Sequence, residues 1–399
     1  MQVTATTPLL NAAVSYNLGE RLLRTTVFQV GSLNGRFEKF LVMIYKLFSQ
    51  FSCSLNPLDE ARANRTVDVL TRLGARLSFV TPRDTKASVQ MMHFKAADLH
   101  EKLKQVGARW EKIQDNNASL IVIIPPENAT DQWMALEKDL SKFRWNKRSV
   151  TIDAVPREVI VTCENAEHVV PHTQSPYLFL HANSASVSFM MLTRRIGFYL
   201  GCGQDACLFD PRGTWKSTGI ASEAGYYNDI TAVFDKVRQD YDLSRIWVSS
   251  ACGGSGPSAH LKAKFHGSVN FIYENGFADL YKDYVVPQGW LVKNFASKFW
   301  SGLASKDIPD EHKPVETGFN ANEMWKDLRP TSTGKIMIAN PDNDQRISAE
   351  VSKRNVELAQ KVNTQVKHIT FHSTSNDPHF DRYYYHSESR AEALKFIFA

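Results

Sequence analysis

The chain has 399 residues, of which 43% are apolar and 22% are charged, a composition typical of a globular protein with a substantial core. A chain of this length predicts two domains. The net charge of +5 is mild and the sequence has no dense Lys/Arg block, which argues against nucleic-acid binding.

The five cysteines form an odd set without a Cys-x-x-Cys pair, which argues against a disulfide framework and against a zinc site. We therefore expect no bound metal and a reducing compartment. Residues 1–17 lack the basic start and apolar core of a signal peptide, and no apolar run has the length of a bilayer-spanning helix. These features predict a cytoplasmic protein without a transmembrane segment. The cysteines are Cys53, Cys163, Cys202, Cys207 and Cys252.

An aromatic-rich amphipathic helix is predicted over residues Arg36 to Phe51, because six apolar residues recur there at helical spacing. One interpretation is that this helix packs on its own domain. The alternative is a peripheral contact with a membrane surface or with a protein partner. The six residues are Phe37, Phe40, Leu41, Ile44, Phe48 and Phe51.

The rest of the first 147 residues alternates helical patterns with a few extended runs and contains no catalytic constellation. We therefore predict a helix-rich N-terminal region, residues 1–147. Its expected helices are residues 57–73, 88–106 and 131–143, and its expected extended runs are 76–80 and 120–124.

From residue 148 onward, short apolar strands alternate with helical segments, and this rhythm predicts an α/β domain, residues 148–399, with a mostly parallel sheet covered by helices on both faces. A hairpin over residues 150–162 is expected to open it. An aromatic-rich segment at about residues 277–333 is expected either to form a substrate-shaping cap or to pack on the sheet edge. The expected strands are residues 177–180, 206–209, 245–248, 269–273, 335–338 and 368–371.

The residues Ser250-Ala251-Cys252-Gly253-Gly254 follow one of these strands and precede a predicted helix. A strand that breaks sharply into a helix, with a nucleophile at the break, is the nucleophile elbow, whose usual form is Gly-x-Ser-x-Gly. Small neighbours are needed because the central residue has strained backbone geometry. The N-terminus of the following helix would favour a Cys252 thiolate. The simpler alternative is an inert buried cysteine.

Polar residues follow the other strands, at the sheet edge where ligand sites lie in open α/β sheets. They are His181-Ala182-Asn183, Asp210, Asp342 and Asp344, and His379. Nucleophile, then acid, then histidine is the chain order of the α/β-hydrolase triad.

On these motifs, the chain from about Ser149 to the C-terminus resembles the α/β-hydrolase superfamily. His181-Ala182-Asn183 resembles its oxyanion loop, and the segment from Asp210 to Ser217 resembles its Asp-x-Arg-Gly-x-Gly-x-Ser turn. Asp344 with Ile347 and His379 with Phe380 are similar to its terminal acid and histidine motifs.

The resemblance implies that Cys252 attacks an acyl carbonyl, that His379 acts as its base and that Asp344 orients the imidazole. The backbone N–H groups of Gly253 and Asn183 would bind the oxyanion. No metal or organic cofactor is required.

Two other carboxylates, Asp342 and Glu274, are alternatives for the acid. The resemblance gives His181 and Asp210 structural roles beside the site.

The sequence departs from the superfamily pattern at Ala182, Trp215, Ser250 and Cys252, although cysteine nucleophiles do occur in enzymes resembling dienelactone hydrolase. The Asp-x-Arg-Gly turn and the long N-terminal region are also similar to the chlamydial CHLPS-type branch of hydrolase-like proteins. That narrower resemblance implies a secreted bacterial effector, exported into a host cell without a classical signal peptide.

Three functions follow as expectations. The first is an acyl hydrolase acting on an ester, thioester or amide of a small molecule, lipid or protein. The second is an inactive binding or scaffold protein on a hydrolase fold. The third is a cysteine peptidase that uses the same site.

Overall fold

The computed structural model describes residues 57–83, 86–115, 118–182, 193–219, 223–265, 268–277, 333–363 and 365–399. The helix predicted over residues 36–51, the oxyanion candidate Asn183 and nearly all of the predicted cap segment lie outside these residues. Among the helices described, none combines the length and the apolar character needed to cross a membrane.

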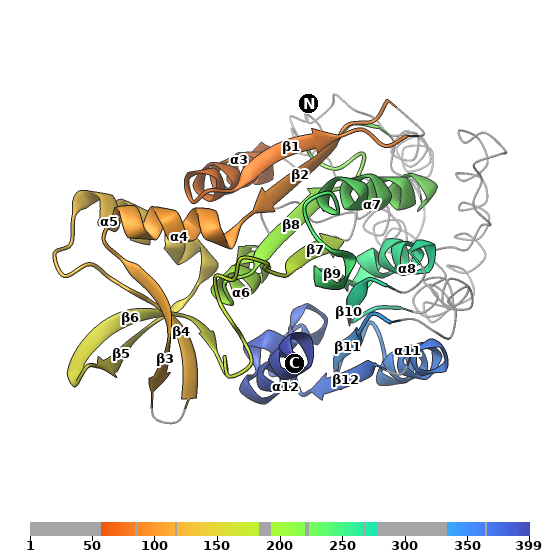
Figure 1. Ribbon diagram of the computed structural model, residues 1–399. Helices are drawn as coiled ribbons and strands as arrows, with labels where there is room; N and C mark the ends of the chain where they lie inside the picture. The colour runs from red at the N-terminus through yellow and green to blue at the C-terminus, as the bar shows by residue number, and fades with distance from the viewer. Residues whose placement is uncertain are drawn as a thin grey trace, which may run out of the picture.

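A sheet of eight strands forms the centre of the molecule, in the order β1-β2-β8-β7-β9-β10-β11-β12 (Figure 1). The six strands from β8 to β12 run parallel, while β1 and β2 are antiparallel at one edge. Strands β7 to β11 are buried along their whole length, which is why they read as continuous apolar runs. The bounds are β1 Arg76–Val80, β2 Val89–Phe94, β7 Leu178–Ala182, β8 Asp205–Asp210, β9 Ile246–Ala251, β10 Asn270–Glu274, β11 Ile336–Pro341 and β12 Val366–Phe371.

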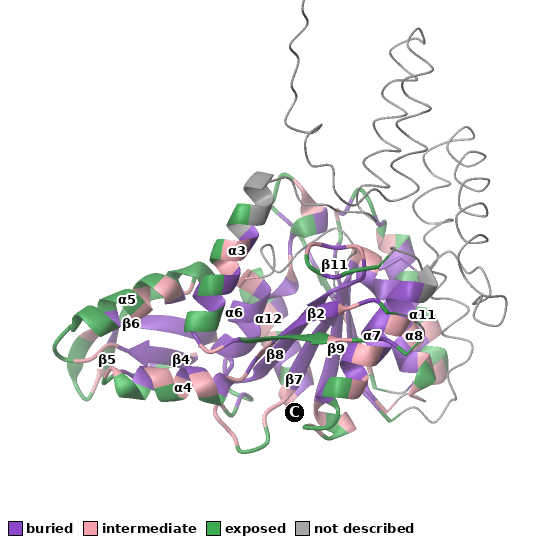
Figure 2. Ribbon diagram, turned by 90° about the horizontal axis from the view of Figure 1, so that it is seen from above, coloured by how far each residue is buried: buried purple, intermediate pink, exposed green. Residues whose placement is uncertain are grey.

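Helices cover both faces of this sheet. On one face, α6 (Thr193–Gly201) and α12 (Ser387–Phe398) contribute to one hydrophobic cluster. On the other face, α7 (Glu223–Val237), α8 (Ser255–Lys264) and α11 (Ala349–Val362) contribute to a second cluster. Figure 2 shows the buried residues along the strands and the exposed residues on the outer sides of the helices. The fold class predicted from the sequence, a mostly parallel α/β sheet between two helical layers, is confirmed.

A second sheet lies to one side of the first (Figure 1). Its four strands are antiparallel, in the order β3-β4-β6-β5, and one of its faces joins the same hydrophobic cluster as α6. The remaining elements are α3 Pro57–Arg72, α4 Ala96–Gln105, β3 Arg109–Asp115, β4 Ala118–Ile124, α5 Asp131–Leu140, β5 Asn146–Ile152 and β6 Val155–Glu164.

The predicted hairpin over residues 150–162 corresponds to β5 and β6, which pair through a two-residue turn at Asp153 and Ala154. Both turn residues have positive φ, as a tight hairpin requires. This hairpin belongs to the second sheet, however, and β5 spans the expected boundary after residue 147. Strands from the two regions expected from the sequence therefore pair within both sheets, β2 with β8 and β4 with β6.

The single helix predicted over residues 88–106 is wrong in its first half. Residues Val89–Phe94 form β2, which pairs with β8, and the helix α4 begins only at Ala96. Pairing with β8 places Met91 and Met92 on opposite faces of the sheet, in different hydrophobic clusters. Burial on both faces outweighs the local helical pattern.

Candidate active site

Cys252 lies in a sharp turn between a buried strand and a helix. β9 ends at Ala251, α8 begins at Ser255, and one 3-10 turn joins them. The φ of Cys252 is 46°, a left-handed conformation that residues with side chains adopt at an energetic cost. The Ser255 hydroxyl donates to the Cys252 carbonyl at 2.5 Å and holds the turn. This geometry is that of a nucleophile elbow, with a thiol at the break.

Ser250 and Trp215 stand where glycines were expected from the resemblance, and their backbone surroundings differ. Ser250, in place of the first elbow glycine, is fully buried, and its hydroxyl donates to the Ile272 carbonyl of the adjacent strand at 3.3 Å. Trp215, in place of a glycine, has φ of 45°, the conformation for which glycine is usually selected.

His379 and Asp344 come from the loops that follow β12 and β11. His379 Nδ1 lies 2.8 Å from Asp344 Oδ2, and both side chains are buried. The other carboxylate oxygen, Oδ1, accepts hydrogen bonds from the backbone N–H groups of Arg346 at 2.8 Å and Ile347 at 3.2 Å. The carboxylate is thus fixed by its own loop and presented to the imidazole.

The charge and hydrogen-bonding capacity of His379 also act on the thiol of Cys252 and lower its pKa. Because Nδ1 is bonded to Asp344, the ring nitrogen that faces the sulfur is Nε2. The imidazole of His379 therefore lies between Cys252 on one side and Asp344 on the other.

The electrostatics of this chain favour a thiolate and an imidazolium. Burial alone raises the pKa of the Cys252 thiol. The charge and hydrogen bond of His379, the Gly253 N–H and the charge of Arg382 outweigh burial and leave that pKa below its ordinary value. Burial lowers the pKa of His379, but Cys252 and Asp344 raise it to about 9. Burial alone would raise the pKa of Asp344. The hydrogen bonds and the charge of His379 outweigh burial, so the pKa of Asp344 lies below its ordinary value.

The two alternative carboxylates lie elsewhere. Asp342 is half-exposed and its Oδ1 lies 2.9 Å from Nδ1 of His372. Glu274 is buried and forms ion pairs with Arg195 and Arg382. Of the three carboxylates, Asp344 is the one placed against His379.

His181 and Asp210 lie at the carboxyl ends of β7, which neighbours the elbow strand β9, and of β8, the next strand beyond β7. The ring of His181 is buried, with Nδ1 3.3 Å from both Ser249 Oγ and Arg195 Nη1. Burial and then the charge of Arg195 keep its pKa well below its ordinary value, so the ring is neutral. The carboxyl group of Asp210 has no hydrogen-bond partner among the described residues. Neither residue contacts Cys252 through a described hydrogen bond.

The oxyanion donors are described only in part. The N–H of Gly253, the residue after Cys252, helps to lower the pKa of the Cys252 thiol, so it lies beside the candidate nucleophile. Asn183 lies outside the described residues.

Cys252 differs in its surroundings from the other cysteines that the structure describes. It is partly exposed, whereas Cys163, Cys202 and Cys207 are buried. Burial raises the pKa of the Cys207 thiol, and burial together with a hydrogen bond to Cys163 raises that of Cys202. Reactivity toward electrophiles is therefore expected to concentrate at Cys252.

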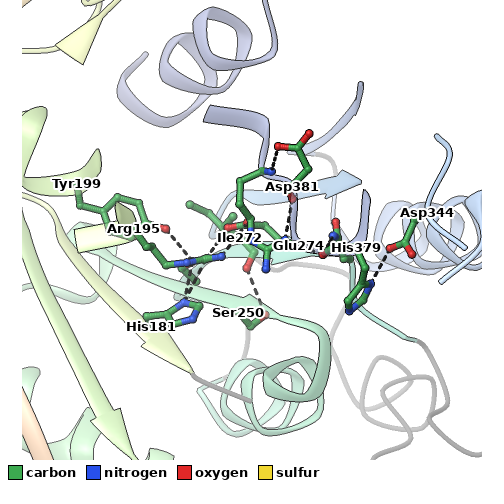
Figure 3. A network of polar contacts seen from close by, with 12 residues as sticks. His181, Arg195, Tyr199, Ser250, Ile272, Glu274, Asp344, His379 and Asp381 are labelled. Atoms are coloured by element: carbon green, nitrogen blue, oxygen red, sulfur yellow. Dashed lines mark hydrogen bonds and ion pairs between the residues drawn. The ribbon is translucent and has the colours of Figure 1, made fainter. Parts of the chain in front are cut away.

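A buried ionic network that the sequence did not predict lies beside Cys252, His379 and Asp344. Arg195 on α6 pairs with Glu274, at the end of β10 (Figure 3). Arg382, which follows His379, also pairs with Glu274. Arg382 and Asn275 also donate to the backbone carbonyl of His379. The sequence marked Glu274 only as an alternative acid, and no local motif marks Arg195 or Arg382, because the three residues come from separate elements that meet only in the folded chain.

Across the described residues, no group of three or more His, Cys, Asp or Glu side chains is arranged to hold a metal ion. No protein-family model matches this sequence, and no curated protein matches it significantly.

Several solved structures are distantly similar. An esterase of Pyrococcus furiosus is 13% identical with a TM-score of 0.42, over 74% of this chain and 92% of that protein. An acetyl xylan esterase from Paenibacillus sp. R4 is 12% identical with a TM-score of 0.39, over 88% of this chain and 98% of that protein. An acylaminoacyl peptidase of Pyrococcus horikoshii is 12% identical with a TM-score of 0.40, over 80% of this chain and 48% of that protein.

Proposed function

We propose that this protein is a hydrolase of the α/β-hydrolase type that cleaves acyl esters, thioesters or amides with Cys252 as the nucleophile. The observation that carries the proposal is the placement of Cys252 at an elbow with positive φ, next to a His379 that is bonded to Asp344 at 2.8 Å. The lowered pKa of Cys252 and the raised pKa of His379 support an ion pair at neutral pH.

In the proposed reaction, the Cys252 thiolate attacks the acyl carbonyl carbon and forms a C–S bond, while the carbonyl π electrons move onto oxygen. The N–H of Gly253, with a second donor expected from Asn183, stabilises that oxyanion. As the C–S tetrahedral adduct collapses, the imidazolium of His379 gives its proton to the leaving alcohol, thiol or amine. Neutral His379 then takes a proton from the water that attacks the thioester carbon, the C–S bond breaks, and the carboxylic acid leaves with the Cys252 thiolate and the His379 imidazolium restored.

Asp344 stabilises the imidazolium and holds Nδ1 as a donor, so that Nε2 faces the sulfur. The carboxylate is itself held by two backbone N–H groups, which keeps it ionised beside the imidazolium.

The test is turnover of matched acyl p-nitrophenyl esters, acyl thioesters and acyl p-nitroanilides of short and long chain length. Cys252→Ala is expected to abolish turnover and His379→Ala to reduce it by at least about a hundredfold. His372→Ala, which changes an exposed histidine at the start of the loop that carries His379, should act as wild type. Mass spectrometry should find the acyl group on Cys252.

Three outcomes separate the expected functions. Turnover of esters or thioesters through acyl-Cys252 supports the acyl hydrolase. Cleavage limited to amides and peptides supports the cysteine peptidase. If wild-type protein shows neither turnover nor an acyl-cysteine with any of these substrates, the hydrolase proposal is wrong and the scaffold function is preferred.

The membrane or partner contact through residues 36–51 and the secreted effector role are separate proposals that rest on the sequence alone. For the first, deletion of residues 1–55 should weaken binding to anionic lipid vesicles. Unchanged vesicle binding with a lower melting temperature would instead indicate that the helix packs on the protein.

A further inference from the structure

The backbone of His379 is held by two side chains that the proposed reaction does not use. Its carbonyl oxygen accepts hydrogen bonds from Arg382 Nη1 at 2.8 Å and from Asn275 Nδ2 at 2.6 Å. Arg382 Nη1 also donates to the carbonyl of Asp381 at 2.7 Å. The turn that carries the imidazole is therefore anchored through its main chain as well as through Asp344.

Arg382 is itself held by Glu274. Its Nε lies 3.3 Å from Glu274 Oε2, and Glu274 is paired on its other side with Arg195 through contacts of 2.6 and 3.0 Å. The three side chains are 13%, 1% and 4% exposed for Arg382, Glu274 and Arg195. Charged hydrogen bonds between such buried groups are short and directional, so the position of Arg382 is well determined.

Arg195 extends this network to the strand that carries the nucleophile. Its Nη1 donates to Ser249 Oγ at 3.0 Å, and the Tyr199 hydroxyl donates to the same oxygen at 2.7 Å. Ser249 lies on β9, the strand that ends in the elbow of Cys252. Figure 3 shows Glu274 between Arg195 and His379. One buried network thus joins the strand that carries Cys252 to the turn that carries His379.

The network also carries excess positive charge, since two guanidinium groups share one carboxylate. The charge of Arg382 acts on Cys252 in the direction that favours the thiolate. A buried charge acts strongly because little water screens it.

We propose that Arg382, held in place by Glu274 and Arg195, is a positioning residue that fixes the His379 turn and supplies positive charge to the Cys252 thiolate. This inference rests on the proposed function, because it assigns Arg382 a role in the reactivity of the same cysteine.

The test is the rate of iodoacetamide labelling of Cys252 between about pH 5 and pH 9, measured by peptide mass spectrometry on the full chain. Arg382→Met removes the charge and the donors but leaves Glu274 paired with Arg195, so no buried carboxylate loses all its partners. We expect labelling at about pH 6 to slow by roughly tenfold, because loss of a nearby positive charge disfavours the thiolate. Near pH 9, where the thiolate forms without help, the rates should converge.

Two further variants define the role. Arg382→Lys keeps the charge without the planar fork, and should retain most of the labelling at low pH but lose turnover. Arg390→Met is the matched control: Arg390 is 15% exposed, pairs with Glu164 and donates to a backbone carbonyl, that of Tyr384, away from the site. It should leave the pH profile of Cys252 unchanged. If Arg382→Met does not fold, Arg382→Gln, which keeps a donor but no charge, carries the same test.

The outcomes for the two proposals are distinct. If wild-type Cys252 labels at low pH no faster than Cys163, Cys202 and Cys207, the proposed function fails. If wild-type Cys252 labels fast and a folded Arg382→Met protein has the same pH profile, the positioning role is wrong and the proposed function stands. A shift of equal size in Arg390→Met would indicate general destabilisation and would also overturn the role of Arg382.

Discussion

Asp344 and His379 come from loops after adjacent parallel strands, β11 and β12, and are joined by a 2.8 Å contact between Oδ2 and Nδ1. Asp342, two residues earlier, lies 2.9 Å from His372. Two carboxylates of one loop are thus each placed against a histidine of the next loop, one pair buried and the other half-exposed. The arrangement offers a matched pair of substitutions for testing the acid.

Asp344→Asn should reduce kcat for acyl transfer by roughly 10³- to 10⁴-fold, because the amide no longer stabilises the imidazolium or fixes its tautomer. Asp342→Asn should leave kcat within about twofold of wild type, since a half-exposed ion pair contributes little. Steady-state kinetics on one activated ester decides between them. Equal losses in both variants would contradict the assignment of Asp344.

The pH dependence of kcat/KM should be bell-shaped. The acidic limb follows the lowered pKa of Cys252, because only the thiolate attacks. The alkaline limb should lie near pH 9, where His379 loses the proton that the leaving group needs. The two groups interact, so the limbs report apparent values of the pair.

The leaving group provides a check on the alkaline limb. An alkyl ester needs the proton of His379, whereas p-nitrophenolate leaves without one. The decline above about pH 9 should therefore be steep for the alkyl ester and shallow for the p-nitrophenyl ester. Identical profiles would argue against His379 as the acid.

Much of the site is predictable from the sequence because it depends on local rules. Cys252, Asp344 and His379 each follow an apolar strand, and the carboxyl ends of parallel strands meet at one edge of the sheet. Even the geometry of Asp344 has a local signal, since its carboxylate accepts the N–H of Ile347, three residues on.

The features that the sequence did not predict depend on contacts between distant segments. β2 is a strand because it pairs with β8, and the residues of Val89–Phe94 carry no alternation that would reveal this. Arg195, Glu274 and Arg382 likewise lie on three different elements. Their mutual burial is set by tertiary packing, which no spacing along the chain reports.

The packing of α6 on the second sheet is tight at Gly201. A methyl group added there would lie 2.2 Å from the Thr162 carbonyl oxygen of β6, which is backbone and cannot rotate away. Gly201→Ala should therefore reduce the free energy of unfolding by about 1–3 kcal/mol. Urea denaturation followed by tryptophan fluorescence measures this change. An unchanged midpoint would show that α6 can move away from β6 at little cost.

Substitution of Asp210, unlike that of Gly201, should stabilise the folded protein. Burial raises the pKa of its carboxyl group well above the ordinary 3.8, so the folded protein retains a proton that the unfolded chain releases. Stability should therefore fall as pH rises above the ordinary value, while at about pH 3 both states are protonated and the effect disappears. Asparagine has nearly the shape of the protonated acid and does not ionise. Asp210→Asn should melt at a higher temperature than wild type at about pH 7 and at the same temperature at about pH 3.

Asp205, at the other end of β8, is the comparison for that prediction: burial raises the pKa of its carboxyl group too, but hydrogen bonds oppose that rise. Its two carboxylate oxygens accept hydrogen bonds from the N–H of Ala96 at 2.7 Å and the hydroxyl of Tyr241 at 2.5 Å. An amide has one acceptor oxygen, so Asp205→Asn should melt at a lower temperature than wild type at about pH 7. Calorimetry at about pH 3 and pH 7 measures the melting temperatures of both variants and of the wild type. If Asp210→Asn also melts lower at about pH 7, the Asp210 carboxylate is ionised and held by a partner, and its pKa is not raised.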